Sequence, residues 1–182
     1  MDASQRRHLV ITGPMGVGKS TTARAVAEEV GRSQRDSDVD IQRLFGRDGG
    51  DIAAHLGVAA LHEIEAAVLL GALADPRQLI ISAAASTVEN PHCRAALRRR
   101  SVVVVLDLDL DRQLQRIQEG DHRRSIRRAE LDRLRRRREP WLEEVADLRL
   151  SATAPPERLR DQILPRWDPL AVTAAVEEDP RS

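Results

Sequence analysis

The sequence predicts a single three-layer α/β domain with a five-stranded parallel sheet and helices on both faces. Three observations lead to this prediction. Short apolar segments alternate with helical patterns, a glycine-rich loop joins the first such segment to the first helix, and residues 102–106 are almost wholly β-branched. A strand that is apolar throughout is buried on both faces, as in a parallel sheet covered by helices. The length of 182 residues fits one domain with a small lid.

The expected strands and helices follow one another along the chain. The strands are residues 9–12, about 33–37, 79–82, 102–106 and 148–151. The segment near 33–37 is polar, and we infer it because the chain must return to the sheet between two helices. The helices carry alanine, leucine and charged residues at helical spacing. They are residues 21–30, 41–45, 51–56, 59–74, 91–100, 110–119, 128–146 and 156–164.

Composition limits the class of protein. The domain is expected to span residues 1–164 with a lid at about 119–128, and residues 165–182 read as a disordered tail rich in proline and acidic residues. The formal net charge is zero, so no overall field attracts nucleic acid or a membrane surface. The start of the chain is polar, no apolar stretch could span a bilayer, and the single cysteine, Cys93, excludes an internal disulfide. We expect a cytoplasmic protein that acts as a monomer.

Residues 13–20 read GPMGVGKS, directly after the first apolar segment and before a helical one. This G-x-x-x-x-G-K-S pattern between a strand and a helix predicts a phosphate-binding loop. Glycines let the backbone turn so that successive N–H groups point at a nucleotide phosphate, and the helix adds its positive end. Lys19 is expected to reach the β- and γ-phosphates, and the Ser20 hydroxyl to bind Mg²⁺. The expected nucleotide-binding residues here are Gly13, Met15, Gly16, Val17, Gly18, Lys19, Ser20 and Thr21.

Three carboxylates, Asp36, Asp38 and Asp40, alternate after the polar second strand. Carboxylates so close repel one another unless a cation lies nearby, and beside a phosphate loop that cation is Mg²⁺ with its waters. A carboxylate here could also accept a proton or a hydrogen bond from a substrate hydroxyl. The alternative is that Asp38 caps the following helix. We favour a site for Asp36 and Asp38 and expect Asp40 to be a solvated acid in the first helical turn.

Two further groups are candidates for a site. His62 and Glu65 lie one helical turn apart, where they could mark a metal site, or Glu65 could position His62 or an arginine, or both could lie on a surface face. Eleven arginines lie between Arg112 and Arg138. Guanidinium groups on a lid could stabilise the charge that develops on a transferring phosphoryl group. The alternatives are a solvated helix or a nucleic-acid patch, and no aromatic residues interleave the arginines as base stacking would require.

Taken in order, these motifs resemble the shikimate kinase family of P-loop small-molecule kinases, over about residues 9–164. GPMGVGKST looks like that family's phosphate loop, Asp36 and Asp38 look like its D-x-D-x-x-I segment, and Arg138 looks like the arginine of its late R-x-P segment. The resemblance implies a P-loop kinase fold with a small lid. It also implies ATP and Mg²⁺ as cofactors and transfer of phosphate to a hydroxyl of a small acceptor.

The resemblance implies roles for individual residues as well. Asp36 would serve the magnesium shell, and Asp38 would bind and orient acceptor hydroxyls. Arg116 falls where an arginine packs on adenine, Arg123 falls at the start of the lid and would close over the phosphates, and Arg138 would hold an acceptor anion. The expected catalytic groups are Lys19, Asp38 and Arg123, and the expected metal ligands are Ser20 and Asp36.

The acceptor half departs from the family pattern at two points. The arginine of the family's F-R-x-x-E segment is His62 here, and its G-G-G turn is Ala83, Ala84 and Ala85. Histidine is a weaker, pH-dependent partner for a carboxylate, and alanine methyl groups restrict φ and narrow the approach to the substrate. We predict an ATP-dependent kinase acting on shikimate or a related cyclitol or sugar acid. The alternative is a nucleotide-binding protein of this fold with altered acceptor specificity or little transferase activity. The expected acceptor-site residues are Asp38, His62, Ala83, Ala84, Ala85 and Arg138.

Overall fold

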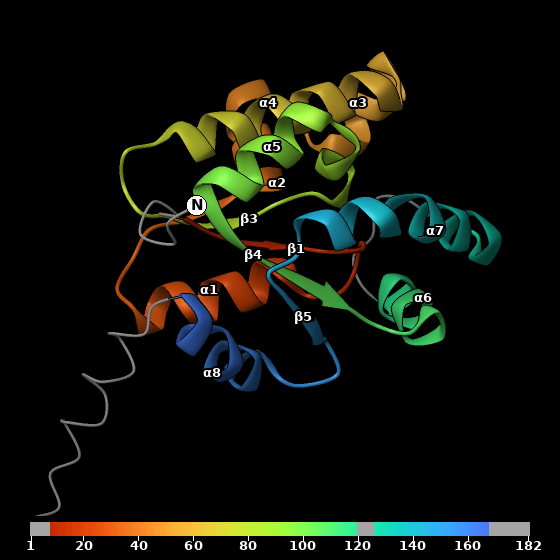
Figure 1. The fold of residues 1–182 in the computed structure, drawn as a ribbon. Coiled ribbons are helices and arrows are strands. Elements are labelled where there is room, and N and C mark those ends of the chain that lie inside the picture. Colours follow the sequence, from red (N-terminus) through yellow and green to blue (C-terminus); the bar gives the residue numbers. More distant parts are fainter. Residues whose placement is uncertain (1–7, 120–125, 168–182) are drawn as a thin grey trace, which may run out of the picture.

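The computed structural model describes residues 8–119 and 126–167. Five parallel strands form one sheet in the order β2-β3-β1-β4-β5 (Figure 1), which confirms the predicted fold class. The predicted Arg123 and most of the lid lie outside the described residues. The strands are β1 (His8–Thr12), β2 (Gln34–Asp36), β3 (Ile80–Ser82), β4 (Ser101–Asp107) and β5 (Leu148–Ser151).

Strand β1 lies at the centre of the sheet. Leu9 pairs with Ile80 of β3 on one side and with Val102 of β4 on the other. All five residues of β1 are buried, as its apolar sequence predicts. The polar β2 pairs only with β3 among the described strands and is an edge strand of half-buried residues, which explains why it lacks an apolar run.

Helices cover both faces of the sheet (Figure 1). Alternate residues of β1 point to opposite faces, so that Val10 packs against α4, α5 and α7, whereas Leu9 and Ile11 pack against α1 and α8. A third, smaller apolar cluster joins α6 to α7. The helices are α1 (Lys19–Glu29), α2 (Ser37–Phe45), α3 (Gly49–Leu56), α4 (Val58–Ala74), η2 (Ala85–Glu89), α5 (Pro91–Arg100), α6 (Leu110–Glu119), α7 (Arg128–Val145) and α8 (Pro156–Trp167).

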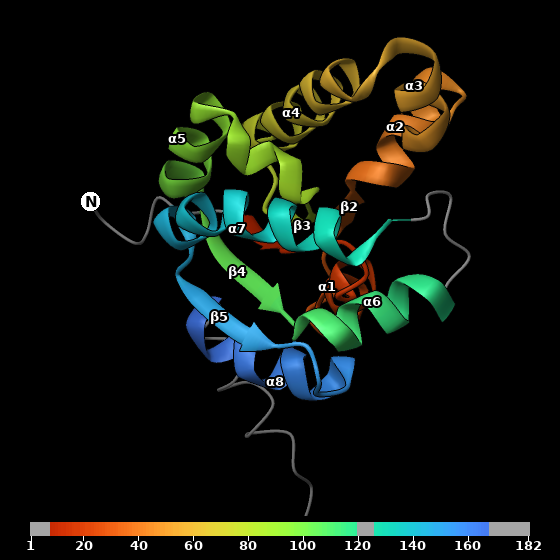
Figure 2. The ribbon, with the colours of Figure 1, turned by 90° about the vertical axis from the view of Figure 1, so that its right-hand side faces the viewer.

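The phosphate loop, the start of α2 and the turn after β3 all follow carboxyl ends of parallel strands, so they meet at one edge of the sheet. Figure 2 views the molecule from this edge, with α2, α3 and α4 above the end of α1 and α6 below it. Ligands of open parallel sheets bind outside this edge, where neighbouring strands connect in opposite directions. The connections from β1 and β3 satisfy that condition here.

The structure departs from the sequence prediction by more than two residues at three places. Helix α8 continues past the expected end at residue 164 to Trp167, because that indole is 7% exposed and packs in the apolar cluster beneath the sheet. Helix α2 begins at Ser37 rather than at residue 41. The short 3-10 helix η2 was not expected. No helix in residues 8–119 or 126–167 is both long and apolar enough to cross a membrane.

Candidate active site

The backbone of the phosphate loop requires glycine for two different reasons. Gly13 has a φ of +138°, and a Cβ atom there would lie 2.1 Å from the carbonyl oxygen of Leu106 in β4. Gly18 has a φ of +93°, and a Cβ atom there would meet no heavy atom within 4 Å. Gly13 therefore lets the loop pass close to the sheet. Gly18 leaves the start of α1 open, where a phosphate can approach the free N–H groups.

Lys19 lies among carboxylates. Its Nζ atom donates a hydrogen bond to the carbonyl oxygen of Pro14 at 3.0 Å, which folds the side chain back over the loop. Burial lowers the pKa of Lys19, while the negative charges of Asp38, Asp36 and Glu65 act to raise it. The loop lysine, both carboxylates of the D-x-D segment and Glu65 therefore share one neighbourhood.

Asp36, not Asp38, caps α2. Its Oδ1 atom accepts hydrogen bonds from the backbone N–H groups of Asp38 at 3.0 Å and Val39 at 3.4 Å. Its Oδ2 atom is buried and has no hydrogen-bond partner within residues 8–119 and 126–167. A buried carboxylate oxygen without a donor is costly unless a ligand satisfies it. This atom therefore fits a cation-binding role.

Hydroxyl groups lie beside this carboxylate. Ser20 Oγ shares a hydrogen bond of 3.4 Å with Ser82 Oγ, and Ser82 is the residue of β3 that pairs with Asp36. Hard oxygen donors of this kind suit Mg²⁺, which keeps several waters and few protein ligands. No cluster of three or more His, Cys, Asp or Glu side chains in the described part of the chain could hold a metal. His62 and Glu65 therefore belong to no such cluster within residues 8–119 and 126–167.

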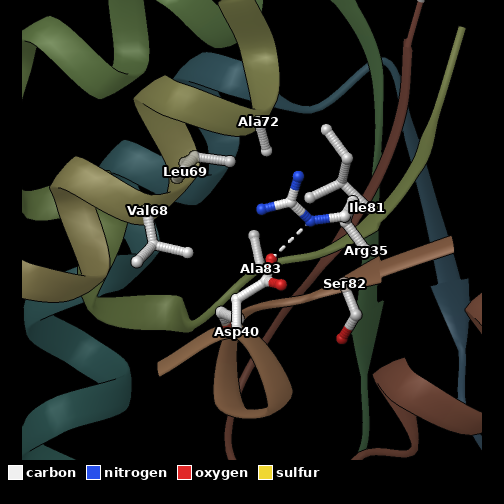
Figure 3. Close-up of a pocket in the computed structure, with 9 residues that line it drawn as sticks. Arg35, Asp40, Val68, Leu69, Ala72, Ile81, Ser82 and Ala83 are labelled. Carbon is white, nitrogen blue, oxygen red and sulfur yellow. Dashed lines mark hydrogen bonds and ion pairs between the residues drawn. The ribbon is translucent and has the colours of Figure 1, made fainter. Parts of the chain in front are cut away.

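Asp40 is buried, contrary to the expectation of a solvated acid. Its side chain is 7% exposed, and its Oδ2 atom accepts a hydrogen bond from Arg35 Nε at 2.6 Å. Figure 3 shows this ion pair in a pocket that is also lined by apolar side chains of α4 and by Ala83 of the turn after β3. Arg35 precedes Asp36 in β2, so the pair joins the strand to the first turns of α2. The sequence prediction failed here because it did not place Arg35 beside the helix.

The acceptor side centres on Glu65 of α4. Glu65 is 9% exposed, and the hydroxyl of Ser86 in η2 donates a hydrogen bond to its Oε2 atom. Burial raises the pKa of Glu65, the Ser86 hydrogen bond opposes this, Asp38 raises it further, and Arg138 and Lys19 lower it. The charges of Asp38, Lys19 and Arg138 therefore all act on Glu65. His62 lies one turn before Glu65 on the same helix and is half-buried.

Arg138 is held by a carboxylate that sequence reasoning missed. Its Nε atom donates to Glu89 Oε1 at 2.8 Å, and Arg137 donates to the other oxygen at 2.5 Å. Glu89 ends η2, and its side chain is 12% exposed. A signal was available, because Glu89 is the first acidic residue after the expected turn at Ala83, Ala84 and Ala85.

The alanine turn is relaxed. No non-glycine residue in residues 8–119 and 126–167 has a positive φ, and Ala84 has an ordinary φ of −63°. Ala83 is 1% exposed and packs in the core cluster with α4, α5 and α7. We expected the alanine methyl groups to narrow the path by which the acceptor approaches. The Ala83 methyl group does not do so, because it points into the core. Of the three alanines, only Ala84 is not fully buried.

A groove beside the phosphate loop could hold a nucleotide base. It has a volume of about 330 Å³, and its lining includes Val17, Gly18, Thr21 and Arg116. Arg116 donates to the carbonyl oxygen of Ala152 at 2.9 Å, which connects α6 to the loop after β5. That loop forms the far wall and was not identified from the sequence. Its lining residues are Ala152, Thr153, Ala154, Pro155 and Pro156.

The arginines of α7 are largely compensated by carboxylates. Arg128 pairs with Asp111, Arg135 with Asp107, and Arg136 with Asp132, in addition to the two arginines on Glu89. A surface that binds a nucleic-acid backbone needs uncompensated cations. The face of α7 is therefore better suited to holding specific side chains in place.

Comparison with known proteins gives the family. The shikimate kinase family model matches residues 15–167. The shikimate kinase of Baumannia cicadellinicola is 30% identical over 157 residues, covering 81% of this chain and 88% of the relative. Shikimate kinase 1 of Sodalis glossinidius is 31% identical over 151 residues, covering 80% and 86%. The chain belongs to the shikimate kinase family. It is thus an ATP-dependent, shikimate kinase-like phosphotransferase with a hydroxyl group as acceptor.

Solved shikimate kinases share the fold. A structure of the Acinetobacter baumannii enzyme in complex with shikimate superimposes with a TM-score of 0.81 at 24% identity, covering 99% of this chain and all of the other. The Aquifex aeolicus enzyme gives a TM-score of 0.74 at 20% identity, with coverage of 94% and 99%. The shikimate kinase fold therefore accounts for the described chain from β1 to α8.

Proposed function

We propose that this shikimate kinase family member transfers the γ-phosphoryl group of ATP to a hydroxyl of shikimate, with Mg²⁺ as cofactor. The observation that supports it most is that the expected phosphate-donor residues and the expected acceptor residues lie within electrostatic reach of one another. Lys19 of the phosphate loop interacts electrostatically with Asp38 and Glu65, while Arg138 acts on both Lys19 and Glu65. The site for the phosphate donor thus adjoins a second site. That second site has a carboxylate for a hydroxyl group and a guanidinium for an acid group.

On the donor side, each group has a chemical task. The N–H groups at the start of α1 and the Lys19 ammonium bind the phosphates, and Arg116 borders the groove that takes the base. Ser20 and the Oδ2 atom of Asp36 would hold Mg²⁺, directly or through water. When bound, Mg²⁺ neutralises charge that develops on the phosphate oxygens.

On the acceptor side, Asp38 accepts the hydrogen bond of the reacting hydroxyl and receives its proton as the oxygen attacks. The bond from the γ-phosphorus to the ADP oxygen breaks, and a bond to the acceptor oxygen forms. Arg138 holds the acceptor carboxylate, and His62 is its second cationic partner when protonated. Arg123, outside the described residues, is proposed to close over the phosphates.

A second candidate is the same transfer to a different small hydroxylated acid. His62 in place of arginine favours it, because a histidine offers less positive charge to an anion than an arginine does. Phosphorylation of another acid in preference to shikimate would establish this candidate.

The test is a coupled assay of ADP release with ATP-Mg²⁺ and a panel of cyclitols and sugar acids that includes shikimate. We expect ADP release to depend on shikimate in the native protein. Lys19→Met and Asp38→Asn should abolish it, while Arg136→Met, an exposed α7 control, should leave it unchanged. ADP release without any acceptor-dependent component would overturn the proposal.

A further inference from the structure

A buried glutamine ties the phosphate loop to two other elements. Gln113 of α6 is 0% exposed, and its Nε2 atom donates a hydrogen bond to the carbonyl oxygen of Met15 at 2.8 Å. Its Oε1 atom accepts a hydrogen bond from Arg135 of α7 at 2.6 Å. The same guanidinium donates to Asp107, at the end of β4, at 2.9 Å. Gln113, Arg135 and Asp107 all lie outside the motifs that indicate the family.

The contact with Met15 sets the direction of a loop N–H group. No described peptide bond is cis, and in a trans peptide the C=O and the following N–H point in opposite directions. Because Gln113 holds the Met15 carbonyl towards α6, the N–H of Gly16 points away from α6. In a loop of this pattern, such N–H groups bind phosphate oxygens.

Arg135 settles which way the Gln113 amide faces. An amide can present either its oxygen or its NH₂ group to a neighbour, whereas a guanidinium can only donate. Arg135 therefore selects the Gln113 oxygen, which leaves the NH₂ group for Met15. A donor-only group on one side and a carbonyl on the other allow a single orientation of the amide.

Two further contacts from α6 reach the next residues of the loop. A Cβ atom on Gly16 would come within 3.0 Å of Ile117 Cγ1, so that side chain lies directly against the loop. Arg116 donates to the carbonyl oxygen of Val17 at 3.5 Å. Helix α6 thus supports three successive loop residues, while Arg135 lies one turn before Arg138 on α7.

We propose that Gln113 and Arg135 are positioning residues for nucleotide binding. Gln113 fixes the Met15–Gly16 peptide with its N–H towards the phosphates, and Arg135 fixes Gln113. The helix that carries Arg138 thereby helps to shape the ATP site. This inference rests on the proposed binding of ATP by the loop.

The experiment measures the dissociation constant of ATP-Mg²⁺ by calorimetry, without acceptor, in four proteins. They are the native chain, Gln113→Leu, Arg135→Met and the double variant. Gln113→Leu leaves the buried Met15 carbonyl without its donor, so we expect about tenfold weaker binding. Arg135→Met should weaken binding about threefold, because the amide is then free to turn. The double variant should match Gln113→Leu alone, since Arg135 acts only through Gln113.

Two controls separate positioning from general damage. Arg135→Lys keeps a donor-only group and should bind ATP almost as the native chain does. Arg136→Met removes the neighbouring arginine of α7, whose side chain is 80% exposed, and should change nothing. In steady-state assays, KM for ATP should rise in Gln113→Leu and KM for the acceptor should not.

The outcomes are distinct. Native affinity in both Gln113→Leu and Arg135→Met would overturn the inference, as would a double variant whose loss equals the product of the single losses. If Gln113→Leu does not fold, the comparison of Arg135→Met with Arg135→Lys tests the inference. Equal ATP affinities of these two variants would overturn it. Lack of ATP binding by the native chain would instead contradict the proposed function on which the inference depends.

Discussion

Substituting Gly13 by alanine should destabilise the fold strongly. The added Cβ atom would lie 2.1 Å from the Leu106 carbonyl oxygen, well inside the 3.4 Å at which ordinary contact begins. The obstacle is the backbone of β4, where Leu106 pairs with Leu150 of β5, so no side-chain rotation relieves the overlap. Overpacking of this kind costs about 1–3 kcal/mol. A φ of +138° costs an L residue about another 1–3 kcal/mol.

The expected loss in the free energy of unfolding for Gly13→Ala is therefore about 2–6 kcal/mol. In a domain of this size, each kcal/mol lowers the melting temperature by about 2–4 °C, so Tm should fall by at least about 4 °C. Urea unfolding followed by circular dichroism measures the free energy, and a thermal melt gives Tm. Both should be recorded without nucleotide, because bound ligand would add its own stabilisation.

Gly31→Ala is the matched control. Gly31 also has a positive φ, of +60°, but a Cβ atom there would meet nothing within 4 Å. It should therefore lose only the conformational cost of about 1–2 kcal/mol. If Gly13→Ala loses no more stability than Gly31→Ala, the close approach of the loop to β4 is not a constraint, and the reasoning is refuted.

Three more predictions concern charged groups. Lys19→Met should abolish ATP binding in calorimetry. Because burial lowers the Lys19 pKa below 10.5, the native free energy of unfolding should rise with pH up to that value, and in the variant this rise should be smaller. Burial raises the Glu65 pKa above 4.5, so the folded state binds more protons than the unfolded state just above that pH. The free energy of unfolding should therefore fall as the pH rises through this window, and Glu65→Gln should make that fall smaller. An unchanged pH profile in urea unfolding of the variant would contradict this. Glu89→Ala should raise KM for the acceptor severalfold, with little effect on KM for ATP, because Arg138 loses its Nε partner. Glu89→Gln should retain most of the function. A lower acceptor KM in Glu89→Ala would contradict this and show that Glu89 competes with the acceptor.

Most strands and helices were predictable because their residue patterns are local. Residues 102–106 indicated a strand buried on both faces, and the loop at 13–20 indicated a strand before it and a helix after it. The end of α8 was not predictable, since Trp167 is kept helical by burial against distant residues. Polar β2 was inferred from topology alone, and its position at the sheet edge explains the weak signal.

The phosphate loop at residues 13–21 could be proposed for a similar reason, because its residues lie within one stretch of chain. The parts that were missed depend on contacts across long sequence distances. Glu89 meets Arg138, and Gln113 meets both Met15 and Arg135, through side chains whose spacing has no local pattern. Asp40 looked like a surface acid until the fold placed Arg35 against it. Ion pairs between helices and strands are set by tertiary packing, which the hydrophobic periodicity of the sequence does not reveal.

The central place of β1 has a consequence for synthesis of the chain. Leu9 is among the first described residues to leave the ribosome, yet its partners in the neighbouring strands are Ile80 and Val102. Both strand partners must emerge before β1 can be buried, and domains of this kind fold as units during translation. The phosphate loop is thus translated before the strands that hold it in place. Until residues 101–107 emerge, β1 lacks its β4 partner, and its apolar residues remain accessible to a chaperone that recognises such segments.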